Sequence, residues 1–364
     1  MIPVAHPKGQ YLSHKKEIDA AVSRVLNSGC YILGRECEAF EQEFAAWQGV
    51  GHCIGVGNGT DALHLALAAL NVGVGDEVIT VSHTAVATVS AIESAGAEPV
   101  LVDIDPLTYT MDPQALEAAV TPKSKAVIPV HLYGHPADMP SIMQIAKRHS
   151  LFVVEDCAQA HGATLGGQKV GTFGHIACFS FYPTKNLGAF GDGGAVTTDN
   201  AALADKIQLL RQYGWKNKFI SEIPGWNSRL DELQAAVLRV KLPHLNEDNT
   251  KREIIAGVYT EELKGLGLGL PTPRKGIGHA YHLYVLRTPR RDHIMAELRK
   301  RGVDAAIHYP RPVHLQPAYQ RFGVRLPETE RAVEEILSLP MFPELDRDDA
   351  LSVTAAFKDI LSRG

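Results

Sequence analysis

The stretch SFYPTKNLGAFGDGGAV, residues 180–196, places one lysine, Lys185, among aromatic residues, glycines and alanines. An apolar, partly desolvated site disfavours the charged form of a lysine, which lowers its pKa and makes the amine a nucleophile. Such amines form Schiff bases with carbonyl compounds, pyridoxal phosphate among them. A structural lysine that caps the C-terminus of a helix would leave the same sequence signal, so both interpretations stay open for this motif alone.

A second chemical group, Asp156, closes an apolar run in VVEDCAQAHGA, residues 153–163. If this run is a strand, the carboxylate lies at the edge of the sheet where α/β proteins bind ligands. There it could pair with a cationic ring nitrogen of a cofactor, with Gln159 and His161 adding hydrogen bonds. A helix cap or a surface acid at a strand end is the plainer alternative.

The third motif, GVGNGTDAL at residues 55–63, predicts a glycine-rich turn from a strand into a helix. Backbone amides at a helix N-terminus bind phosphate, and the Thr60 hydroxyl could add a contact. No GK[ST] follows as in a Walker loop, and Thr60 occupies the last required glycine position of GxGxxG. Glycine-rich turns also occur at strand ends for geometric reasons alone.

The three motifs are more specific together than any one of them. In this order on one sheet, they supply a contact for each end of pyridoxal phosphate. The turn would bind the phosphate, Asp156 would keep the pyridine nitrogen protonated, and Lys185 would bind the aldehyde. A protonated ring nitrogen lets the ring accept the electrons released when a Cα–H bond breaks.

The elements that must position these groups alternate between short β-branched runs and longer helical stretches. Strands are predicted at 52–57, 76–81, 98–105, 125–132, 150–156 and 195–199, and helices at 60–70, 84–96, 112–120, 138–149 and near 201–212. Continuous apolar strands between helices predict an α/β fold with a doubly wound, mostly parallel sheet. Right-handed crossovers would bring the C-terminal ends of the strands to one edge.

The C-terminal part predicts a smaller α+β lobe. A loop at 213–228 precedes a helical stretch at 230–263 that Pro243 should kink or divide, and residues 265–279 resemble a linker. Strands are then expected at 281–288 and 306–310, and helices at 293–302 and near 328–337 and 346–362. We therefore predict a large cofactor-binding domain at 1–250 and a small domain at 251–364.

The composition narrows the class of protein. A formal net charge of −5, with 45% hydrophobic and 21% charged residues, implies no broad basic surface for nucleic acid. The five cysteines form no CxxC pair, as expected of a reduced cytoplasmic protein. No signal peptide and no apolar run of membrane-spanning length is visible. We predict a cytoplasmic protein that needs no metal.

At this level of detail the chain resembles the DegT/DnrJ/EryC1/StrS sugar aminotransferases, which are fold-type I pyridoxal-phosphate enzymes. The resemblance runs through nearly the whole chain, in SGCYILG (28–34), NGTDALHLAL (58–67), PVHLYGHPADM (129–139), VEDCAQAHGA (154–163), SFYPTKNLGAFGDGGAV (180–196), NSRLDELQAA (227–236) and HYPRPVHLQPAY (308–319).

The resemblance implies a role for each of several site residues. Lys185 would be the Schiff-base lysine, Asp156 the partner of the ring nitrogen, and Gln159 a neighbour of the ring hydroxyl. Gly59, Thr60 and Ser180 would hold the phosphate. Asp61, which follows Thr60, would also contact the cofactor. The family's active site lies at a dimer interface, which implies a homodimer in which Asn227 reaches the phosphate of the neighbouring subunit.

One position departs from the family pattern. Many members carry an aromatic residue that stacks on the cofactor ring just after the threonine of the stretch that here reads SHTAVAT, residues 82–88. This chain has Ala85 there. Either His83 or another side chain covers the ring, or that face is left open for the substrate.

The implied reaction is a ping-pong transamination. An amino acid, usually glutamate in this family, would donate its amino group, and a nucleotide-linked keto sugar would accept it. The motifs are most similar to those of the branch that acts on C-3 of dTDP-3-keto-6-deoxyhexoses. That branch suggests Tyr182, His308 and Tyr309 near the sugar, whereas the diphosphate would need cations such as Arg229, Lys216 or Lys218.

Other functions remain as alternatives. Amination at C-4 of a 4-keto sugar is the main rival to amination at C-3. A related pyridoxal-dependent sugar dehydratase has histidine in place of the lysine, and a non-catalytic regulator would be expected to lose Lys185 or Asp156. A nucleotide-dependent oxidoreductase would need an intact GxGxxG, which Thr60 interrupts.

Overall fold

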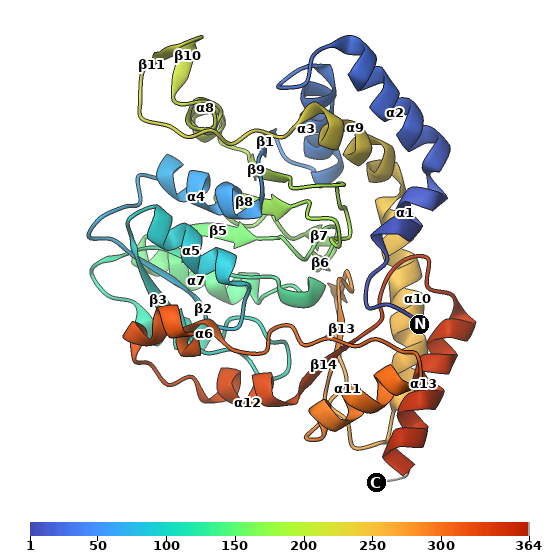
Figure 1. Ribbon diagram of the computed structural model, residues 1–364. Helices are drawn as coiled ribbons and strands as arrows, with labels where there is room; N and C mark the ends of the chain where they lie inside the picture. Colours follow the sequence, from blue (N-terminus) through green and yellow to red (C-terminus); the bar gives the residue numbers. More distant parts are fainter. Residues whose placement is uncertain (363–364) are drawn as a thin grey trace.

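A seven-stranded, mostly parallel sheet forms the centre of the protein, whose computed structural model describes residues 1–362 (Figure 1). The strand order is β1-β9-β8-β5-β4-β2-β3, and β9 alone runs antiparallel to its neighbours. The strands of this sheet are β1 (His52–Val56), β2 (Glu77–Val81), β3 (Glu98–Val102), β4 (Ser124–Ile128), β5 (Phe152–Asp156), β8 (Ile176–Ser180) and β9 (Gly194–Thr198).

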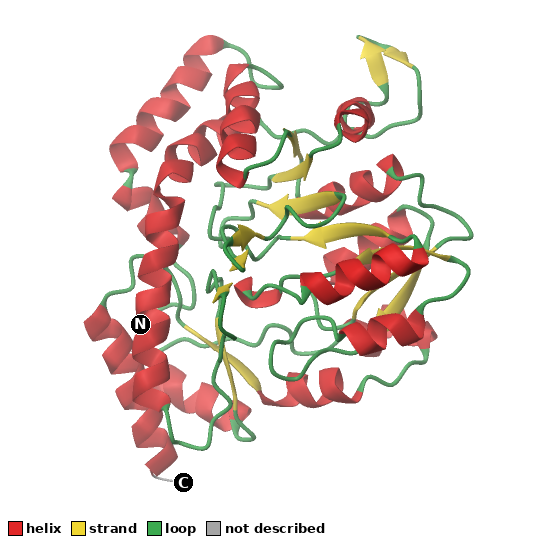
Figure 2. Cartoon of the chain, turned by 180° about the vertical axis from the view of Figure 1, so that it is seen from behind, coloured by secondary structure: helices red, strands yellow, loops and turns green. Residues whose placement is uncertain are grey.

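Helices cover both faces of this sheet, as the predicted α/β fold requires (Figures 1 and 2). Alternate residues of one strand point to opposite faces, so Val153 and Val154 of β5 belong to different apolar cores. One face packs against α4 (Gly59–Ala69), α5 (Val86–Ser94) and α8 (Ala201–Leu210), and the other against α6 (Pro113–Ala119), α7 (Met139–His149), α3 (Arg35–Gln48) and α9 (Glu232–Lys241).

The C-terminal ends of the parallel strands meet at one edge, where the sequence motifs emerge. Asp156 ends β5 and Ser180 ends β8, while β9 begins at that same edge with Gly194. Gly194 pairs with both Val56 and Ser180. A Cβ atom on Gly194 would lie 2.4 Å from the Asn58 carbonyl oxygen, so the close approach of β9 to the phosphate turn requires glycine.

Most predicted helices and strands of the large sheet are confirmed within a few residues. Asp112 and Asp138 cap α6 and α7, each accepting a hydrogen bond from a backbone amide of the first turn. Pro243 divides the long helical stretch into α9 and α10 (Leu245–Leu263), which a 3₁₀ turn at Leu242–His244 joins. Other short elements lie outside the sheet: α1 (Pro7–Ser13), α2 (Lys15–Ser28), β6 (Thr164–Leu165), β7 (Gln168–Lys169), β10 (Trp215–Asn217), β11 (Ile220–Ser221), β12 (Ile277–Gly278) and a 3₁₀ turn at Leu132–Gly134.

The C-terminal part differs from the prediction in its second strand. The strand expected at 306–310 is wrong, because this segment forms only one bridge, between Ala306 and Ser338, and then crosses to the large sheet. The partner of β13 (Tyr284–Arg287) is β14 (Ile336–Leu339), a fully buried run whose first two residues fall within the helix predicted near 328–337. The remaining elements are α11 (Arg291–Lys300), α12 (Pro327–Glu335), α13 (Arg347–Ser362) and 3₁₀ turns at Val313–Leu315 and Pro317–Phe322.

A separate apolar core lies in this C-terminal part, where α10, α11 and α13 pack against β13 and β14. The first residues of the chain join it, since Ile2 pairs with Val303 and the Met341 amide donates to the Val4 carbonyl at 3.0 Å. Helix α10 runs through position 250, and the division at 250 and 251 stays a prediction. Among residues 1–362, none of the helices combines the length and apolar character needed to cross a bilayer.

Candidate active site

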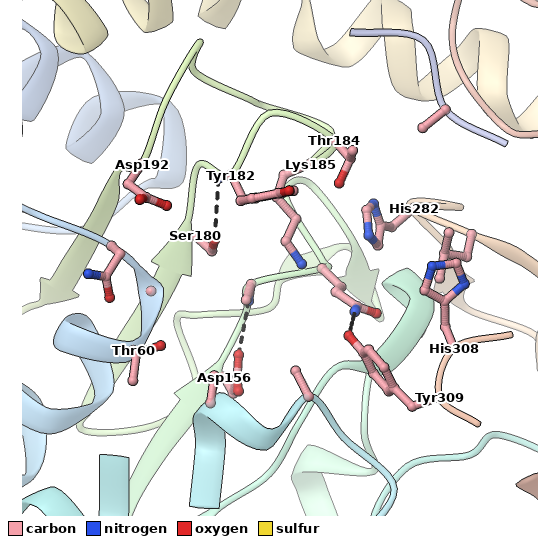
Figure 3. Close-up of a pocket in the computed structure, with 18 of the residues that line it drawn as sticks. Thr60, Asp156, Ser180, Tyr182, Thr184, Lys185, Asp192, His282, His308 and Tyr309 are labelled. Atoms are coloured by element: carbon pink, nitrogen blue, oxygen red, sulfur yellow. Dashed lines mark hydrogen bonds between the residues drawn. The ribbon is translucent and has the colours of Figure 1, made fainter. Parts of the chain in front are cut away.

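A cavity of about 680 Å³ opens at the C-terminal edge of the parallel strands (Figure 3). The sheet edge supplies one wall, and the chain's first residues and its C-terminal part supply the other. The wall from the sheet includes Asn58, Gly59, Thr60, Asp61, Ala85, Ala87, Asp156, Gln159, Ser180, Tyr182, Thr184, Lys185 and Asp192, and the opposite wall Val4, Ala5, His282, Leu283, His308, Tyr309 and Met341.

Lys185 lies in the loop after β8, and its side chain points into the cavity toward Asp156 (Figure 3). The loop is a tight turn in which the Lys185 amide donates to the Tyr182 carbonyl at 2.8 Å. Burial lowers the pKa of Lys185 from its usual 10.5 to about 8, against the opposing attraction of Asp156. Near pH 7 roughly a tenth of this amine is therefore neutral, far more than for an ordinary lysine with a pKa of about 10.4, and the neutral form is the nucleophile.

Asp156 is buried beneath this amine. Its carboxylate accepts hydrogen bonds from the Thr88 hydroxyl at 2.9 Å and from the Ala158 amide at 3.1 Å. Burial raises the pKa of Asp156, and the two hydrogen bonds and Lys185 oppose that shift. A carboxyl group in this state gains from a cationic N–H donor in the cavity, because such a partner would stabilise its ionised form.

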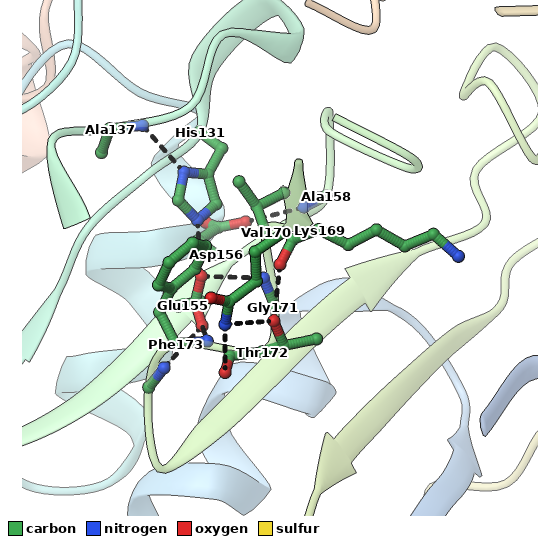
Figure 4. A network of polar contacts seen from close by, with 12 residues as sticks. His131, Ala137, Glu155, Asp156, Ala158, Lys169, Val170, Gly171, Thr172 and Phe173 are labelled. Carbon is green, nitrogen blue, oxygen red and sulfur yellow. Dashed lines mark hydrogen bonds and ion pairs between the residues drawn. The ribbon is translucent and has the colours of Figure 1, made fainter. Parts of the chain in front are cut away.

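A network behind Asp156 holds this strand end in place (Figure 4). Glu155 is fully buried and accepts from the amides of Gly171, Phe173 and Gly174 at 2.7, 2.8 and 2.7 Å, and it pairs with His131 Nε2 at 3.0 Å. The Ala137 amide donates to His131 Nδ1 at 3.0 Å, so His131 carries its proton on Nε2 and donates to Glu155. Every carboxylate lone pair is thus directed to a donor, away from the cavity.

The N-terminus of α4 forms the other end of the cavity. Asn58 caps the helix, and its side-chain oxygen accepts from the Asp61 amide at 2.8 Å. Gly59 faces Ser180 so closely that a Cβ atom on Gly59 would lie 2.7 Å from the Ser180 Cβ atom. Thr60 and Ser180 both line this end of the cavity (Figure 3). Free amides at a helix N-terminus, together with hydroxyl groups, suit a phosphate dianion.

Asp61 has a second contact that sequence reasoning did not predict. Its carboxylate accepts from the Ser228 hydroxyl at 2.6 Å, and that hydroxyl accepts from the Gly57 amide at 2.9 Å. Asp61 thus ties the loop around residue 228 to the phosphate turn, besides lining the cavity.

The predicted sugar-site residues Tyr182, His308 and Tyr309 all line the cavity. Tyr182 is 53% exposed, which leaves its ring free to meet a ligand. Tyr309 accepts a hydrogen bond from Gln159 Nε2 at 3.1 Å. Burial lowers the pKa of His308 to about 4, so this imidazole is neutral at pH 7.

Six of the residues named from the sequence do not line the cavity: His83, His161, Lys216, Lys218, Asn227 and Arg229. His83 is buried behind it, at 2.7 Å from the Tyr133 hydroxyl, so its position does not support the role of covering the cofactor ring. The small side chains of Ala85 and Ala87 occupy the wall instead. Asn227 is exposed, and Arg229 lies outside the lining of the same chain. Their assignments to a partner's phosphate and to the diphosphate stay predictions.

Several lining residues were not predicted. Asp192 belongs to the GDGG turn of the lysine motif, where its residue type alone indicates no role, and it lines the phosphate end of the cavity (Figure 3). Thr184 is the neighbour of Lys185 and could have been found from that position alone. Val4, His282 and Met341 carry no sequence signal, because only the tertiary packing of the C-terminal part brings them to the site.

These groups fit pyridoxal phosphate. A buried amine with a lowered pKa suits its aldehyde, a buried carboxyl group whose open side faces the cavity suits its ring nitrogen, and the α4 N-terminus suits its phosphate. Their arrangement on a mostly parallel sheet defines the fold-type I class of pyridoxal-phosphate transferases.

Within this class, the chain belongs to the DegT/DnrJ/EryC1/StrS aminotransferase family, which matches residues 12–358. This confirms the membership predicted from the motifs. The chain is 50% identical to the erythromycin biosynthesis sensory transduction protein EryC1 of Saccharopolyspora erythraea, over 98% of this chain and 99% of that protein. It is 47% identical to the dTDP-3-amino-3,4,6-trideoxy-α-D-glucose transaminase of Streptomyces venezuelae, over 100% and 97% of the two chains.

Two solved structures support the same fold. The crystal structure of S. venezuelae DesV has a TM-score of 0.98 at 47% identity and covers 100% of this chain and 99% of its own. NtdA of Bacillus subtilis, solved with bound cofactor PMP, has a TM-score of 0.91 at 33% identity, over 96% of this chain and 82% of its own.

Proposed function

We propose that this aminotransferase moves an amino group from L-glutamate to C-3 of a nucleotide-linked 3-keto-6-deoxyhexose, with pyridoxal phosphate as cofactor. The observation that carries the proposal is the buried Lys185 amine, with a pKa lowered to about 8, facing the Asp156 carboxyl group. The transaminase of S. venezuelae, named for a dTDP-3-amino sugar, supports C-3 and the thymidine nucleotide.

Pyridoxal phosphate, when bound, supplies an electron-accepting ring that carries the amino group between the two halves of the reaction. The protein's own groups do the rest. Asp156 would accept the hydrogen bond of the ring N–H and keep that proton in place, while Thr88 fixes the orientation of its carboxylate. Lys185 Nζ would hold the cofactor at its aldehyde carbon and, as a free amine, would take up the proton at the substrate Cα. The α4 N-terminus and Ser180 would hold the phosphate.

The first test is the state of Lys185 in the purified protein. We expect a visible absorption band that borohydride abolishes, with the reduced cofactor attached to the peptide that contains Lys185. Lys185→Ala should bind pyridoxal phosphate without a reducible bond. A reducible bond that survives in Lys185→Ala would refute the assignment of this lysine.

The position of amination is tested in the reverse direction, with stable amino sugars. The holoenzyme and 2-oxoglutarate are offered dTDP-linked 3-amino- and 4-amino-6-deoxyhexoses and a UDP-linked 3-amino sugar, and glutamate formation is measured. We expect glutamate from the dTDP-linked 3-amino sugar. Glutamate only from the 4-amino sugar would overturn the choice of C-3, and preference for the UDP-linked sugar would overturn the choice of nucleotide.

A regulatory role without catalysis is the second candidate, because the relative from S. erythraea is named a sensory transduction protein. The site argues against it here. A protein that had lost catalysis would have no need to keep a lysine buried at a cost in stability beside Asp156. Absence of any transamination in a protein with a reducible Lys185 bond would favour the regulator.

We further propose that the enzyme is a homodimer with shared sites, which the exposed position of Asn227 supports. Mixing inactive Lys185→Ala with a weakened Asn227→Ala variant tests this. If Asn227 acts across the interface, mixed dimers regain one intact site, and activity rises above that of either variant. No gain on mixing, under conditions where subunits exchange, would place Asn227 outside the neighbour's site. The predicted cytoplasmic location stays a prediction.

A further inference from the structure

The segment 306–314 carries His308 and Tyr309 into the cavity from the C-terminal part of the chain. We propose that Tyr133 is a positioning residue that latches this segment over the site and thereby sets the geometry of the sugar half-reaction. The inference rests on the proposed function for its substrate, and its closing experiment separates failure of the one from failure of the other.

Both ends of the segment are anchored, one to each part of the molecule. At the first end, Ala306 exchanges backbone hydrogen bonds of 3.1 and 2.8 Å with Ser338 of β14, and the Ser338 hydroxyl lies 2.9 Å from His308 Nδ1. At the other end, the Val313 amide donates to the Ser82 carbonyl at 3.1 Å. The Ser82 hydroxyl accepts from the His314 amide at 3.1 Å and lies 2.7 Å from His314 Nδ1.

The middle of the segment, which enters the cavity, is held by Tyr133 and Gln159. The Tyr133 hydroxyl donates to the His308 carbonyl. Gln159 Nε2 donates to the Tyr309 hydroxyl at 3.1 Å, and Gln159 Oε1 accepts from the Tyr133 amide at 2.7 Å. These contacts close a ring that links Tyr133, Gln159, Tyr309 and His308. Neither of the two sugar-site residues can shift without breaking a member of this ring.

Tyr133 is itself fixed from every side. It is 3% exposed and has a φ of 61°, a left-handed conformation that a tyrosine keeps only where its surroundings impose it. Its carbonyl accepts from the Leu283 amide at 3.3 Å, which ties it to a second residue of the cavity wall. The hydroxyl, amide and carbonyl groups of Tyr133 thus bind three different segments of the chain, so Tyr133 connects these segments to one another.

The hydrogen bond from the Tyr133 hydroxyl to the His308 carbonyl also gives a role to the buried side chain of His83. Since the single Tyr133 hydroxyl proton goes to the His308 carbonyl, His83 Nε2 must donate to the Tyr133 oxygen at 2.7 Å. Burial lowers the pKa of His83 to about 4, so the ring is neutral at pH 7 and Nδ1 carries no proton. His83 therefore orients Tyr133, and Tyr133 orients the sugar-site segment.

The test removes one hydroxyl group, that of Tyr133, from the holoenzyme. Tyr133→Phe keeps the buried ring but removes the donor to the His308 carbonyl. We expect an unchanged cofactor spectrum and an unchanged single-turnover rate with glutamate, because Tyr133 does not line the cavity and the variant keeps the amide hydrogen bond that holds Gln159. With the dTDP-linked 3-amino sugar, kcat/KM should fall roughly 5- to 30-fold, the effect of one or two kcal/mol, mostly through KM.

A matched control is available in the same cluster. Tyr109 is also buried, also has a φ of 61°, and its ring centroid lies 5.6 Å from that of Tyr133, but it makes no contact with segment 306–314 through its hydroxyl among residues 1–362. Tyr109→Phe should leave both half-reactions unchanged. Equal loss in the two half-reactions of Tyr133→Phe, or a sugar half-reaction like that of the wild type, would overturn the latch. No turnover of any amino sugar by the wild type would instead refute the proposed function.

If Tyr133→Phe does not fold, the contact is tested from His83. His83→Leu removes the donor to the Tyr133 oxygen, whereas His83→Gln restores an amide N–H in its place. The latch predicts a loss confined to the sugar half-reaction in the leucine variant, with recovery in the glutamine variant. Identical kinetics in the two variants would refute it.

Discussion

At the scale of single residues, the chemistry depends on a lysine amine with a lowered pKa and on a buried carboxyl group that can pair with a cationic donor. Burial achieves both, because it disfavours the charged form of each group. The two shifts would be smaller if Lys185 and Asp156 formed a close ion pair. In the structure Asp156 instead accepts from Thr88 and Ala158, which leaves its open side to the cavity.

The lowered pKa of Lys185 predicts its reactivity in the cofactor-free protein. With an amine-acylating reagent, modification of Lys185 should rise with pH and reach half its maximum near pH 8, because the neutral amine reacts. Peptide mapping after a short exposure measures this. Asp156→Asn should shift the midpoint lower still, since the Asp156 charge raises the Lys185 pKa. A midpoint near that of ordinary lysine would contradict the desolvated site.

Asp156→Asn should separate catalysis from stability. An amide cannot balance the charge of a protonated ring nitrogen, so both half-reactions should slow by roughly 100-fold or more, the loss typical of a preorganised electrostatic contact. The cofactor-free protein should melt at the same or a higher temperature, because burial already disfavours the Asp156 charge. Thr88→Val, which removes only the orienting hydroxyl, should give a smaller loss. An unchanged rate in Asp156→Asn would refute its role.

At the scale of elements, the start of α4 decides how the phosphate is held. Asn58 fixes the first turn of the helix by accepting from the Asp61 amide at 2.8 Å. The same cap occurs far from the site at α8, where Asn200 accepts from the Leu203 amide at 3.2 Å. The two asparagines therefore form a pair with equal roles in folding and different distances from the cavity.

This pair gives a controlled prediction. Asn58→Ala and Asn200→Ala should each lower the free energy of unfolding by about 1 kcal/mol, the usual contribution of an N-cap. Only Asn58→Ala should also weaken pyridoxal phosphate binding, by roughly tenfold, because hydrogen bonds to a charged group are lost as the first turn frays. Urea denaturation and absorbance titration of cofactor-free protein measure the two effects. Equal cofactor affinity in both variants would show that the α4 N-terminus does not hold the phosphate.

Elements of the large sheet could be predicted because the signal is local. Apolar strands and Pro243 act through neighbours in sequence, and they lie where they were predicted, except that no strand was predicted at β8 (Ile176–Ser180). The strand predicted at 306–310 failed because its apolar residues serve a crossing segment, whereas β14 was hidden behind a helix-like run.

The same distinction between local and long-range signals explains which residues of the site could be predicted. Lys185, Asp156 and the phosphate turn lie in motifs whose residue types indicate their chemistry. His83 was assigned to the cavity from its place beside Ala85, and its neighbour in space, Tyr133, could not be known. Residues such as Met341 and His282 reach the cavity only through packing of segments distant in sequence.

At the scale of the whole molecule, the cavity lies where the large sheet meets the C-terminal part, and buried neutral histidines gather around this junction. Burial lowers the pKa of His83 and His308 to about 4 and that of His161 to about 3, and it holds the pKa of His279 and His282 well below the usual 6.5. Asp156 acts in the opposite sense, because its raised pKa favours the folded state as protons are added. Glu344, whose pKa burial also raises, acts in the same sense as Asp156, and the five histidines outweigh these two groups.

These shifts predict that the cofactor-free protein loses stability as the pH falls from about 6.5 to about 4. Across this range the unfolded chain protonates its histidines, while the folded protein keeps these five neutral, so the unfolded state binds more protons and gains with each step toward acid. A histidine whose pKa falls from 6.5 in the unfolded chain to about 4 in the folded protein, such as His83, lowers the free energy of unfolding at acid pH by up to about 3 kcal/mol.

Urea midpoints at pH 7, 6 and 5 should decline steadily. His161→Phe, which keeps an aromatic ring between Phe179 and Phe181, should make that decline shallower, whereas substitution of the surface residue His149 by glutamine should leave it unchanged. A urea midpoint that is constant between pH 7 and 5 would mean that these imidazoles are already protonated in the folded protein.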